Sequence, residues 1–144
     1  MPDRALRHEY RRFVAVPTRW MDNDVYGHLN NVVHYSLFDT AVNRTLIEAG
    51  LLDIHHGAII GLVVESGCRY HAPIAYPDIV HAGLRVGRLG RSSVRYEIGL
   101  FRGDDPGAAA EGHFVHVHVD RTTRRPVELP ADWRSFFESL TPQA

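Results

Sequence analysis

Lysine is absent from the sequence, and all 16 of its basic residues are arginine. This absence excludes Walker-type phosphate loops, Schiff-base enzymes and serine–lysine hydrolases, because each of them depends on a lysine side chain. Cys68 is the only cysteine, so the chain can form neither an intrachain disulfide nor a tetrathiolate zinc site. Its small thiol is typical of a buried position in a strand.

The sequence also lacks a large charge imbalance and a long apolar run. Its formal net charge of −1 predicts no attraction to nucleic acid or to an anionic membrane. No segment approaches the roughly 20 apolar residues that a membrane-spanning helix needs, and residues 1–12 contain no signal-peptide pattern. We therefore expect a cytoplasmic protein whose residues 1–144 form a single domain.

Apolar periodicity divides the chain into a strand, a long helix and four further strands. Residues 9–19 alternate as a first strand, and Pro17 is typical of a sheet edge. A helix is predicted from Asn30 or Asn31 to a stop at Gly50, because apolar residues recur every three or four positions, at Tyr35, Phe38, Val42, Leu46 and Ala49. Four segments rich in Val, Ile, Phe and Tyr follow, and a short helix is expected after Pro130.

This order of elements predicts an α+β fold, in which a five-stranded antiparallel sheet with hairpin-connectable strands wraps around one central helix. The apolar stripe of the helix must be buried in the concave face of the sheet. The convex face and the sheet edges would then remain uncovered. We therefore expect the chain to pair with further copies, as a homodimer or a homotetramer.

Polar chemistry is concentrated in residues 20–39, WMDNDVYGHLNNVVHYSLFD, around the start of the predicted helix. The backbone N–H groups that open a helix lack partners and carry the positive end of its dipole. They can hold a developing oxyanion while one of the two nearby carboxylates attacks a carbonyl or activates water. Gly27 would let the chain turn sharply and approach a ligand closely.

The pattern D-x-D-x-x-G-H-x-N-N, from Asp22 to Asn31, resembles the signature of hotdog-fold acyl-CoA thioesterases of the 4-hydroxybenzoyl-CoA thioesterase type. The F-D-x-A that begins at Phe38 fits the same family, and the order of strands and helix extends the resemblance to nearly the whole chain. The resemblance implies hydrolysis of an acyl-CoA to a free acid and CoA, without a metal or redox cofactor. It also implies an active site at a dimer interface, where Glu65, Ser66 and Cys68 could serve the partner subunit.

The resemblance assigns roles to individual residues. Asp24 matches the general base or nucleophile, and Asn31 matches the residue whose backbone N–H polarises the thioester carbonyl. His28 matches a position in the catalytic loop and completes the catalytic candidates. The candidates for substrate binding are Gly27, Asn30, Tyr35, Asp39, Arg88, Arg91 and Ser92.

Three of these candidates also have physical arguments of their own. Asp39 falls inside the apolar stripe, where a buried carboxylate needs a partner or a raised pKa, so it is a second candidate for the catalytic acid. Arg88 and Arg91 bracket a turn between two strands and, with nearby serine hydroxyls, offer hydrogen bonds to the phosphates of CoA. Surface arginines without a ligand explain the same pattern equally well.

The sequence also contains features of other types of site. An EF-hand fails, because Tyr26 and Val33 occupy positions that need oxygen ligands. His116 and His118 share one face of a strand and form a possible zinc pair, although we expect them on the outer surface of the sheet or at a subunit contact, with Val115, Val117 and Val119 facing the core. A non-catalytic protein that binds acyl-CoA or acyl-carrier protein is the second hypothesis. His34 stands where members of the resembling family usually have an aromatic residue, so the shape of the acyl pocket and the identity of the acyl group stay open.

Overall fold

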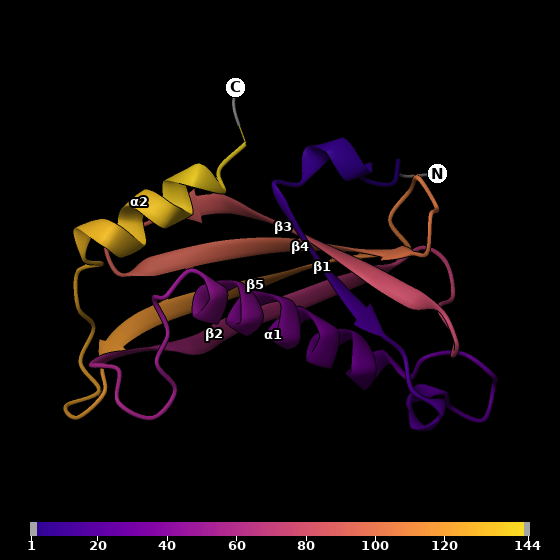
Figure 1. Cartoon of the computed structure of the whole chain (residues 1–144), viewed down its shortest axis with the longest axis horizontal. Helices are drawn as coiled ribbons and strands as arrows, with labels where there is room; N and C mark the ends of the chain where they lie inside the picture. The colour runs from indigo at the N-terminus through magenta and orange to yellow at the C-terminus, as the bar shows by residue number, and fades with distance from the viewer. Residues whose placement is uncertain (1–2, 143–144) are drawn as a thin grey trace.

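The computed structural model describes residues 3–142 and contains one five-stranded antiparallel sheet, with strands in the order β1-β3-β4-β5-β2 (Figure 1). The predicted sheet with a long helix packed against it is confirmed. No helix within the described residues has the length and hydropathy needed to cross a membrane. The elements are η1 (Arg7–Glu9), β1 (Arg12–Pro17), η2 (Trp20–Asp22), α1 (Asn31–Glu48), β2 (Ile59–Tyr70), β3 (Ile79–Leu89), β4 (Ser93–Arg102), β5 (Ala110–Asp120) and α2 (Ala131–Ser139).

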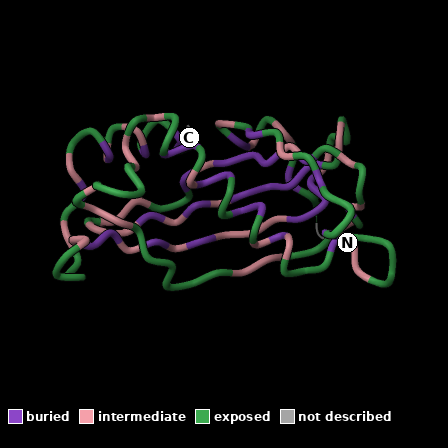
Figure 2. The backbone as a smooth tube through the Cα atoms, turned by 60° about the horizontal axis from the view of Figure 1, so that its bottom comes forward, coloured by how far each residue is buried: buried purple, intermediate pink, exposed green. Residues whose placement is uncertain are grey.

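Helix α1 forms where the sequence predicts it and packs along one face of the sheet. The Asn30 side chain caps its start by accepting a hydrogen bond from the Val32 N–H at 3.0 Å. The chain leaves the helix through Gly50, whose φ of +75° favours glycine. The buried side of α1 includes Phe38, Ala41 and Val42, each fully buried, and the buried residues gather in the middle of the molecule (Figure 2).

Strand β2 departs from the expected chain of hairpins. It pairs with β5 at one edge of the sheet, whereas β3 pairs with β1 near the other edge. The prediction of consecutive hairpins is therefore wrong for β2, because its pairing is set by contacts far apart in sequence. The connection from β2 to β3, residues 71–78, instead crosses the end of the sheet and borders the pocket described below.

The sheet face opposite α1 is partly covered, contrary to the sequence prediction. Tyr10 lies across Gly83 and Gly99, and a Cβ atom at either glycine would come within 3.0 Å of its side chain. Tyr10 and Phe101 belong to a small second core that the N-terminal segment closes. Arg85, which bonds Glu97 at 2.9 Å, continues this face as a charged surface. The N-terminal segment thus removes part of the free surface that an oligomer could use.

Helix α2 closes the sheet at the end away from residues 20–30 (Figure 1). It covers His116 and His118, which are 5% and 0% exposed, so the prediction that they face the outer surface is wrong. The His118 ring packs edge-on against Trp133 of α2 at 5.3 Å and lies 5.9 Å from Phe137. Of the three valines expected in the core, only Val119 is buried, while Val115 and Val117 are half-buried.

Candidate active site

The loop between η2 and α1 is a closed turn. Asn23 and Leu29 form an isolated antiparallel bridge, and the Asp24 N–H donates to the His28 carbonyl at 2.8 Å. The turn is completed by the Gly27 N–H, which donates to the Asp24 carbonyl at 3.2 Å. Gly27 has a φ of +86°, so the prediction of a sharp turn at this glycine is confirmed.

The turn positions the Asp24 carboxylate. Its Oδ1 accepts a hydrogen bond from the Tyr26 N–H at 2.8 Å, which fixes the side chain against its own backbone. Its Oδ2 lies 3.9 Å from Nδ1 of His28, and about a fifth of the Asp24 side chain (21%) is exposed. One carboxylate oxygen is therefore anchored while the other has no close donor among the described residues.

The first N–H of helix α1 is also free. The Asn30 side chain satisfies the N–H of Val32, and the Asn30 carbonyl accepts from the N–H of Val33 at 2.9 Å. The Asn31 N–H donates to no group in residues 3–142. It therefore offers an unpaired donor at the positive end of the α1 dipole.

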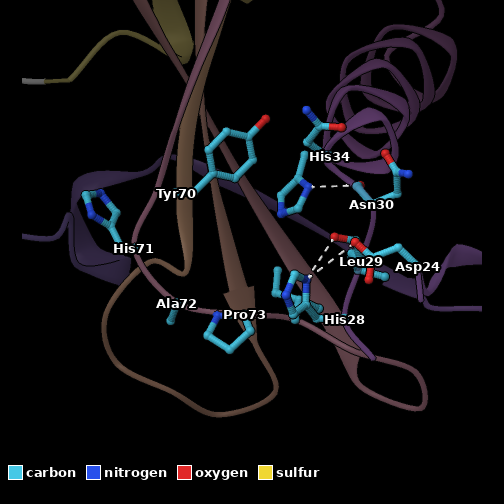
Figure 3. Close-up of a pocket in the computed structure, with 11 residues that line it drawn as sticks. Asp24, His28, Leu29, Asn30, His34, Tyr70, His71, Ala72 and Pro73 are labelled. Carbon is cyan, nitrogen blue, oxygen red and sulfur yellow. Dashed lines mark hydrogen bonds and ion pairs between the residues drawn. The ribbon is translucent and has the colours of Figure 1, made fainter. Parts of the chain in front are cut away.

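Asp24 and Asn31 border the same cavity, which has a volume of 610 Å³. In Figure 3 the labelled side chains from the loop, from α1 and from the end of β2 surround this space. The predicted residues Asp24, His28, Asn30 and Asn31 all line it, and Gly27 does not. The lining residues are Asp24, His28, Leu29, Asn30, Asn31, His34, Tyr70, His71, Ala72, Pro73 and Ile74.

The connection between β2 and β3 holds the loop in place. The Leu29 N–H donates to the Ile74 carbonyl at 2.7 Å, and the Tyr76 N–H donates to Oδ1 of Asn23 at 3.0 Å. Asp22 is a buried turn residue whose carboxylate accepts from the Arg19 N–H at 2.7 Å and from the Arg19 guanidinium at 2.9 Å. The pocket thus rests on one backbone and one side-chain hydrogen bond between two segments about 50 residues apart, Asn23–Leu29 and Ile74–Tyr76.

Two further residues, His34 and Tyr70, line the pocket; the family resemblance relates His34 to the acyl pocket, whereas no sequence pattern points to Tyr70. Their rings meet edge-on with centroids 4.8 Å apart. His34 follows Asn30 by one helical turn, so its position on the pocket side of α1 could have been found from the helical repeat. Burial lowers the pKa of His34 below its usual value, which keeps the imidazole neutral. Tyr70 belongs to the end of β2, and no local pattern predicts that it faces α1.

Two predicted substrate-binding residues of α1 lie outside the cavity. Asp39 is exposed and accepts a hydrogen bond from Nδ2 of Asn43 at 3.0 Å, so the prediction of a buried carboxylate is wrong. The apolar stripe of α1 is narrower than its sequence suggests, and Asp39 points to solvent beside it. Tyr35 is half-buried and packs edge-on against Phe38, with ring centroids 5.7 Å apart. Their roles in substrate binding stay predictions.

The residues predicted to bind CoA lie at the end of the sheet that is far from the pocket of the same chain. Strand β3 begins beside Asp78, which contacts Thr18 near the pocket, so strand rise places Arg88 roughly 30 Å away. Arg88 and Arg91 are exposed, and Arg91 lies 3.6 Å from Glu128. Ser92 is half-buried at the same turn. A single chain therefore does not bring these residues to the pocket.

The remaining candidates lie on or near β2. Glu65 and Ser66 are exposed on this edge strand, and Glu65 bonds His113 at 2.8 Å. Cys68 is half-buried rather than buried, and burial raises the pKa of its thiol, so it is a poor nucleophile. Residues 3–142 contain no group of three or more histidine, cysteine, aspartate or glutamate side chains placed to hold a metal ion.

Comparison with known proteins identifies the family. Residues 16–137 match the family model of the thioesterase-like superfamily. The PA5185 protein of Pseudomonas aeruginosa strain PAO1 has 52% sequence identity and a TM-score of 0.94, over 98% of this chain and 99% of that chain. No curated protein matches the chain.

Two further solved structures carry thioesterase names. The PA2801 protein of Pseudomonas aeruginosa, provisionally named a thioesterase, has 31% identity and a TM-score of 0.82 over 88% of this chain and 98% of that chain. A thioesterase of Thermus thermophilus, solved with coenzyme A and zinc, has 30% identity and a TM-score of 0.75 over 92% of this chain and 95% of that chain. With its five-stranded sheet and packed helix, the chain therefore belongs to the thioesterase-like superfamily and has the hotdog fold.

Proposed function

We propose that the protein hydrolyses an acyl-CoA thioester to a free acid and CoA in the pocket that contains Asp24 and Asn31. One observation carries this proposal: an unpaired helix N–H and a carboxylate line the same cavity. Thioester hydrolysis needs a donor for the carbonyl oxygen and a base or nucleophile for the carbonyl carbon, and the pocket offers one of each. The superfamily supports hydrolysis of a thioester, and the relative solved with coenzyme A supports CoA as the leaving thiol.

The start of helix α1 would stabilise the oxygen that becomes negative. A tetrahedral intermediate carries charge on the former carbonyl oxygen, and a preorganised N–H lowers its energy more than that of the uncharged substrate. The Asn31 N–H suits this role because the Asn30 cap already satisfies the N–H of Val32. The capping side chain thus leaves the first N–H free for substrate.

Asp24 would supply the second half of the reaction. As a general base it takes a proton from water while the water oxygen attacks the carbonyl carbon, and collapse of the intermediate breaks the C–S bond and releases the thiolate. As a nucleophile, its carboxylate oxygen attacks the same carbon, expels the thiolate and forms an anhydride that water then hydrolyses. Both routes end in the same acid and thiol. His28, 3.9 Å from Asp24, would orient the carboxylate in either route.

A second copy of the chain would complete the site. Strand β2 is a sheet edge on which Leu62, Val63 and Val64 are exposed, and such an edge is suited to pairing with another strand. Antiparallel pairing of two β2 strands about a two-fold axis reverses the direction of the partner's sheet. The turn that carries Arg88 and Arg91 would then lie at the same end of the joined sheet as the pocket, where it could bind the phosphates of CoA.

The test of this proposal is the substitution Asp24→Asn. The asparagine keeps an oxygen that can accept from the Tyr26 N–H, so the loop should survive while the base is lost. Turnover of acyl-CoA substrates should fall by at least ~100-fold. It is measured by the release of free thiol from a panel of acyl-CoAs, and thermal unfolding checks that the fold is intact.

Two further variants give this test its controls. Asp104→Asn makes the same change at an exposed carboxylate in a loop outside the pocket and should retain the wild-type rate. Asp39→Asn distinguishes the two carboxylate candidates, because a large loss there with little loss at Asp24 would move the catalytic role to the exposed side of α1. Saturable binding of acyl-CoA without any thiol release would instead identify a binding protein.

A further inference from the structure

We propose that the α1–β2 turn (residues 53–57) of a second copy of the chain covers the Asp24 pocket, where His55 and His56 of the partner subunit hydrogen-bond to the substrate. This inference rests on the proposed function, because it completes the same site. One chain alone leaves the site open to solvent, since Asn31 and several other lining residues are exposed. A carboxylate and an N–H donor act more strongly on a reacting carbonyl when a neighbouring surface excludes water from them.

The cavity reaches the free edge of the sheet. Tyr70 and residues 71–74 line it, and they form the end of edge strand β2 and the segment that directly follows. Within the described chain β2 pairs on one side only, with β5, and exposed apolar side chains occupy its middle, at Leu62, Val63 and Val64. A second copy that pairs with this edge therefore lies directly beside the cavity.

Symmetry determines which part of the second copy reaches the cavity. In antiparallel pairing about a two-fold axis, residues at equal distances before and after the axis lie opposite one another. With the axis at Val63, in the middle of the exposed apolar stretch, Ile59 lies opposite the partner's Gly67. The α1–β2 turn, just before Ile59, then lies beside the partner's residues 69–73. In Figure 1 this turn and the loop of residues 20–30 lie at opposite ends of α1, and the two-fold axis brings one to the other.

The backbone of the α1–β2 turn is held firmly, but its tip is free. Oδ1 of Asp53 accepts hydrogen bonds from the N–H groups of His55 and His56, each at 3.1 Å. The Arg121 guanidinium donates to the Ile54 carbonyl at 2.7 Å and to the Asp53 carbonyl at 3.2 Å. Both histidines are exposed, and neither imidazole hydrogen-bonds to another group of the described chain. The turn is therefore preorganised to present two imidazoles to another molecule.

The pocket end carries an apolar surface that this turn can cover. Among the described residues, the five large apolar side chains with the greatest exposure all belong to the loop and the first turn of α1: Trp20, Met21, Val25, Tyr26 and Val32. An exposed apolar patch beside a pocket is typical of an interaction surface. Ile54 at the tip of the α1–β2 turn is also exposed, and the two-fold axis brings it to this patch. Two exposed apolar surfaces at opposite ends of one chain thus cover each other in the dimer.

The first experiment tests the position of the turn without measuring activity. Ala58 and Arg69 are exposed and lie roughly 35 Å apart along one chain, but they come together across the two-fold axis. A variant with Ala58→Cys and Arg69→Cys in a Cys68→Ala background should therefore form covalent dimers with a short bis-maleimide, as seen on a denaturing gel. Each single-cysteine control should remain monomeric. Monomers alone in the double-cysteine variant would overturn this inference and leave the proposed hydrolysis standing.

The second experiment removes the two imidazoles. The double variant His55→Ala/His56→Ala should lower kcat/KM for acyl-CoA substrates by roughly 10-fold, because two hydrogen bonds to the substrate are lost. His8→Ala makes the same change at an exposed histidine of the N-terminal segment and should keep the wild-type value. Thermal unfolding should be unchanged in both variants, because the replaced side chains are exposed. A wild-type kcat/KM in the double variant would overturn the role of the histidines.

The third experiment shows which subunit the histidines serve. Mixed dimers of one Asp24→Asn subunit and one double-variant subunit are purified through two different tags. One of their two pockets then combines an intact Asp24 with an intact turn from the neighbouring subunit, so about half of the wild-type activity should return. Activity no higher than half that of the double variant would show that each turn serves its own chain, and would overturn the inference. Absence of thiol release from every acyl-CoA in the wild-type protein would instead overturn the proposed function, and with it the role of the histidines.

Discussion

The face of the sheet on which α1 packs has histidines toward both of its ends, in two different surroundings. At one end, which we call the open end, His34 lines the same cavity of 610 Å³ as Asp24 and Asn31. At the closed end, His116 and His118 lie under α2, and no atom of His118 reaches solvent. The same residue type thus occurs in a solvent-accessible pocket and in a sealed core.

The two ends differ in what satisfies their polar atoms. At the open end, backbone groups and the Asn30 cap pair neighbouring N–H groups, and Asn31, whose N–H has no partner among residues 3–142, lines the cavity. At the closed end, Nε2 of His116, Nε2 of His118 and the Tyr96 hydroxyl are buried and bond to no group among the described residues. Burial lowers the pKa of His116 to about 4 and also lowers that of His118, so both rings remain neutral at pH 7.

This difference shows why residue type alone does not identify a site. A His-x-His pair suggests a metal ligand or a catalytic group, yet here aromatic rings surround it and keep it neutral. The open end has a charged carboxylate and an unpaired donor that a substrate can reach. We therefore assign chemistry to the open end and stability to the closed end, and the following predictions test that division.

The largest expected effect is on stability at the closed end. Phe137 is fully buried and contacts Tyr96, His118 and Trp133. Phe137→Ala should lower the free energy of unfolding by about 3–5 kcal/mol, because it removes a large ring and leaves a cavity. Chemical denaturation of the purified protein measures this change.

The neighbouring phenylalanine provides the matched control. Phe136 is half-buried, and the Arg12 guanidinium lies 5.8 Å from its ring centroid. Phe136→Ala should lower the free energy of unfolding clearly less than Phe137→Ala does, because the Phe136 side chain buries less apolar surface. Equal losses in the two variants would mean that α2 is only loosely packed, and the division between the two ends would fail.

The pH dependence of stability is the next largest effect. Because the folded pKa of His116 is about 4 and the unfolded value is about 6.5, the unfolded chain binds a proton first as the pH falls. Stability should therefore be independent of this group above pH ~6.5 and decrease as the pH falls toward 4, by about 3 kcal/mol over the whole window. Denaturation curves between pH 7 and 5 measure most of this loss before carboxylates titrate.

His116→Phe isolates this contribution. The substitution keeps an aromatic ring beside Phe114 and Tyr96 and removes the titrating group. Its unfolding free energy should decrease less steeply than that of the wild-type protein as the pH is lowered. Parallel curves for the two proteins would show that His116 takes up a proton equally well in the folded and unfolded states, contrary to its burial.

Much of the open end could be predicted from sequence, because its determinants are local. The bounds of α1 follow closely from its helical repeat, the Asn30 cap and the stop at Gly50. The sharp turn at Gly27 likewise follows from the sequence. The polar loop and the first helix turn are neighbours in sequence, so Asp24 and Asn31 were expected close together. His34 lines the same pocket from one helical turn after Asn30.

The failures concern contacts between distant segments. Period-two alternation in β5 correctly puts His116 and His118 on one face, but it does not tell which face α2 will cover when the chain returns after Pro130. The pairing of β2 with β5 likewise joins segments separated by some 50 residues. The sequence predicts a buried Asp39 because α1 has apolar residues around much of its circumference. Periodicity alone therefore overestimates how much of the α1 surface is buried.

The smallest predicted effect is at Asn30, the N-terminal cap of α1 at the open end. Asn30→Ala removes the acceptor for the Val32 N–H and should lower the free energy of unfolding by about 1 kcal/mol, less than the change at Phe137. Asn30→Ser retains an acceptor and should restore most of this stability. Thiol release measured on the same proteins should also fall in Asn30→Ala, because the freed Val32 N–H changes the donors at the helix start. A loss of stability comparable to that of Phe137→Ala would show that the open end contributes as much to folding stability as the closed end. The assignment of chemistry to one end and stability to the other would then be wrong.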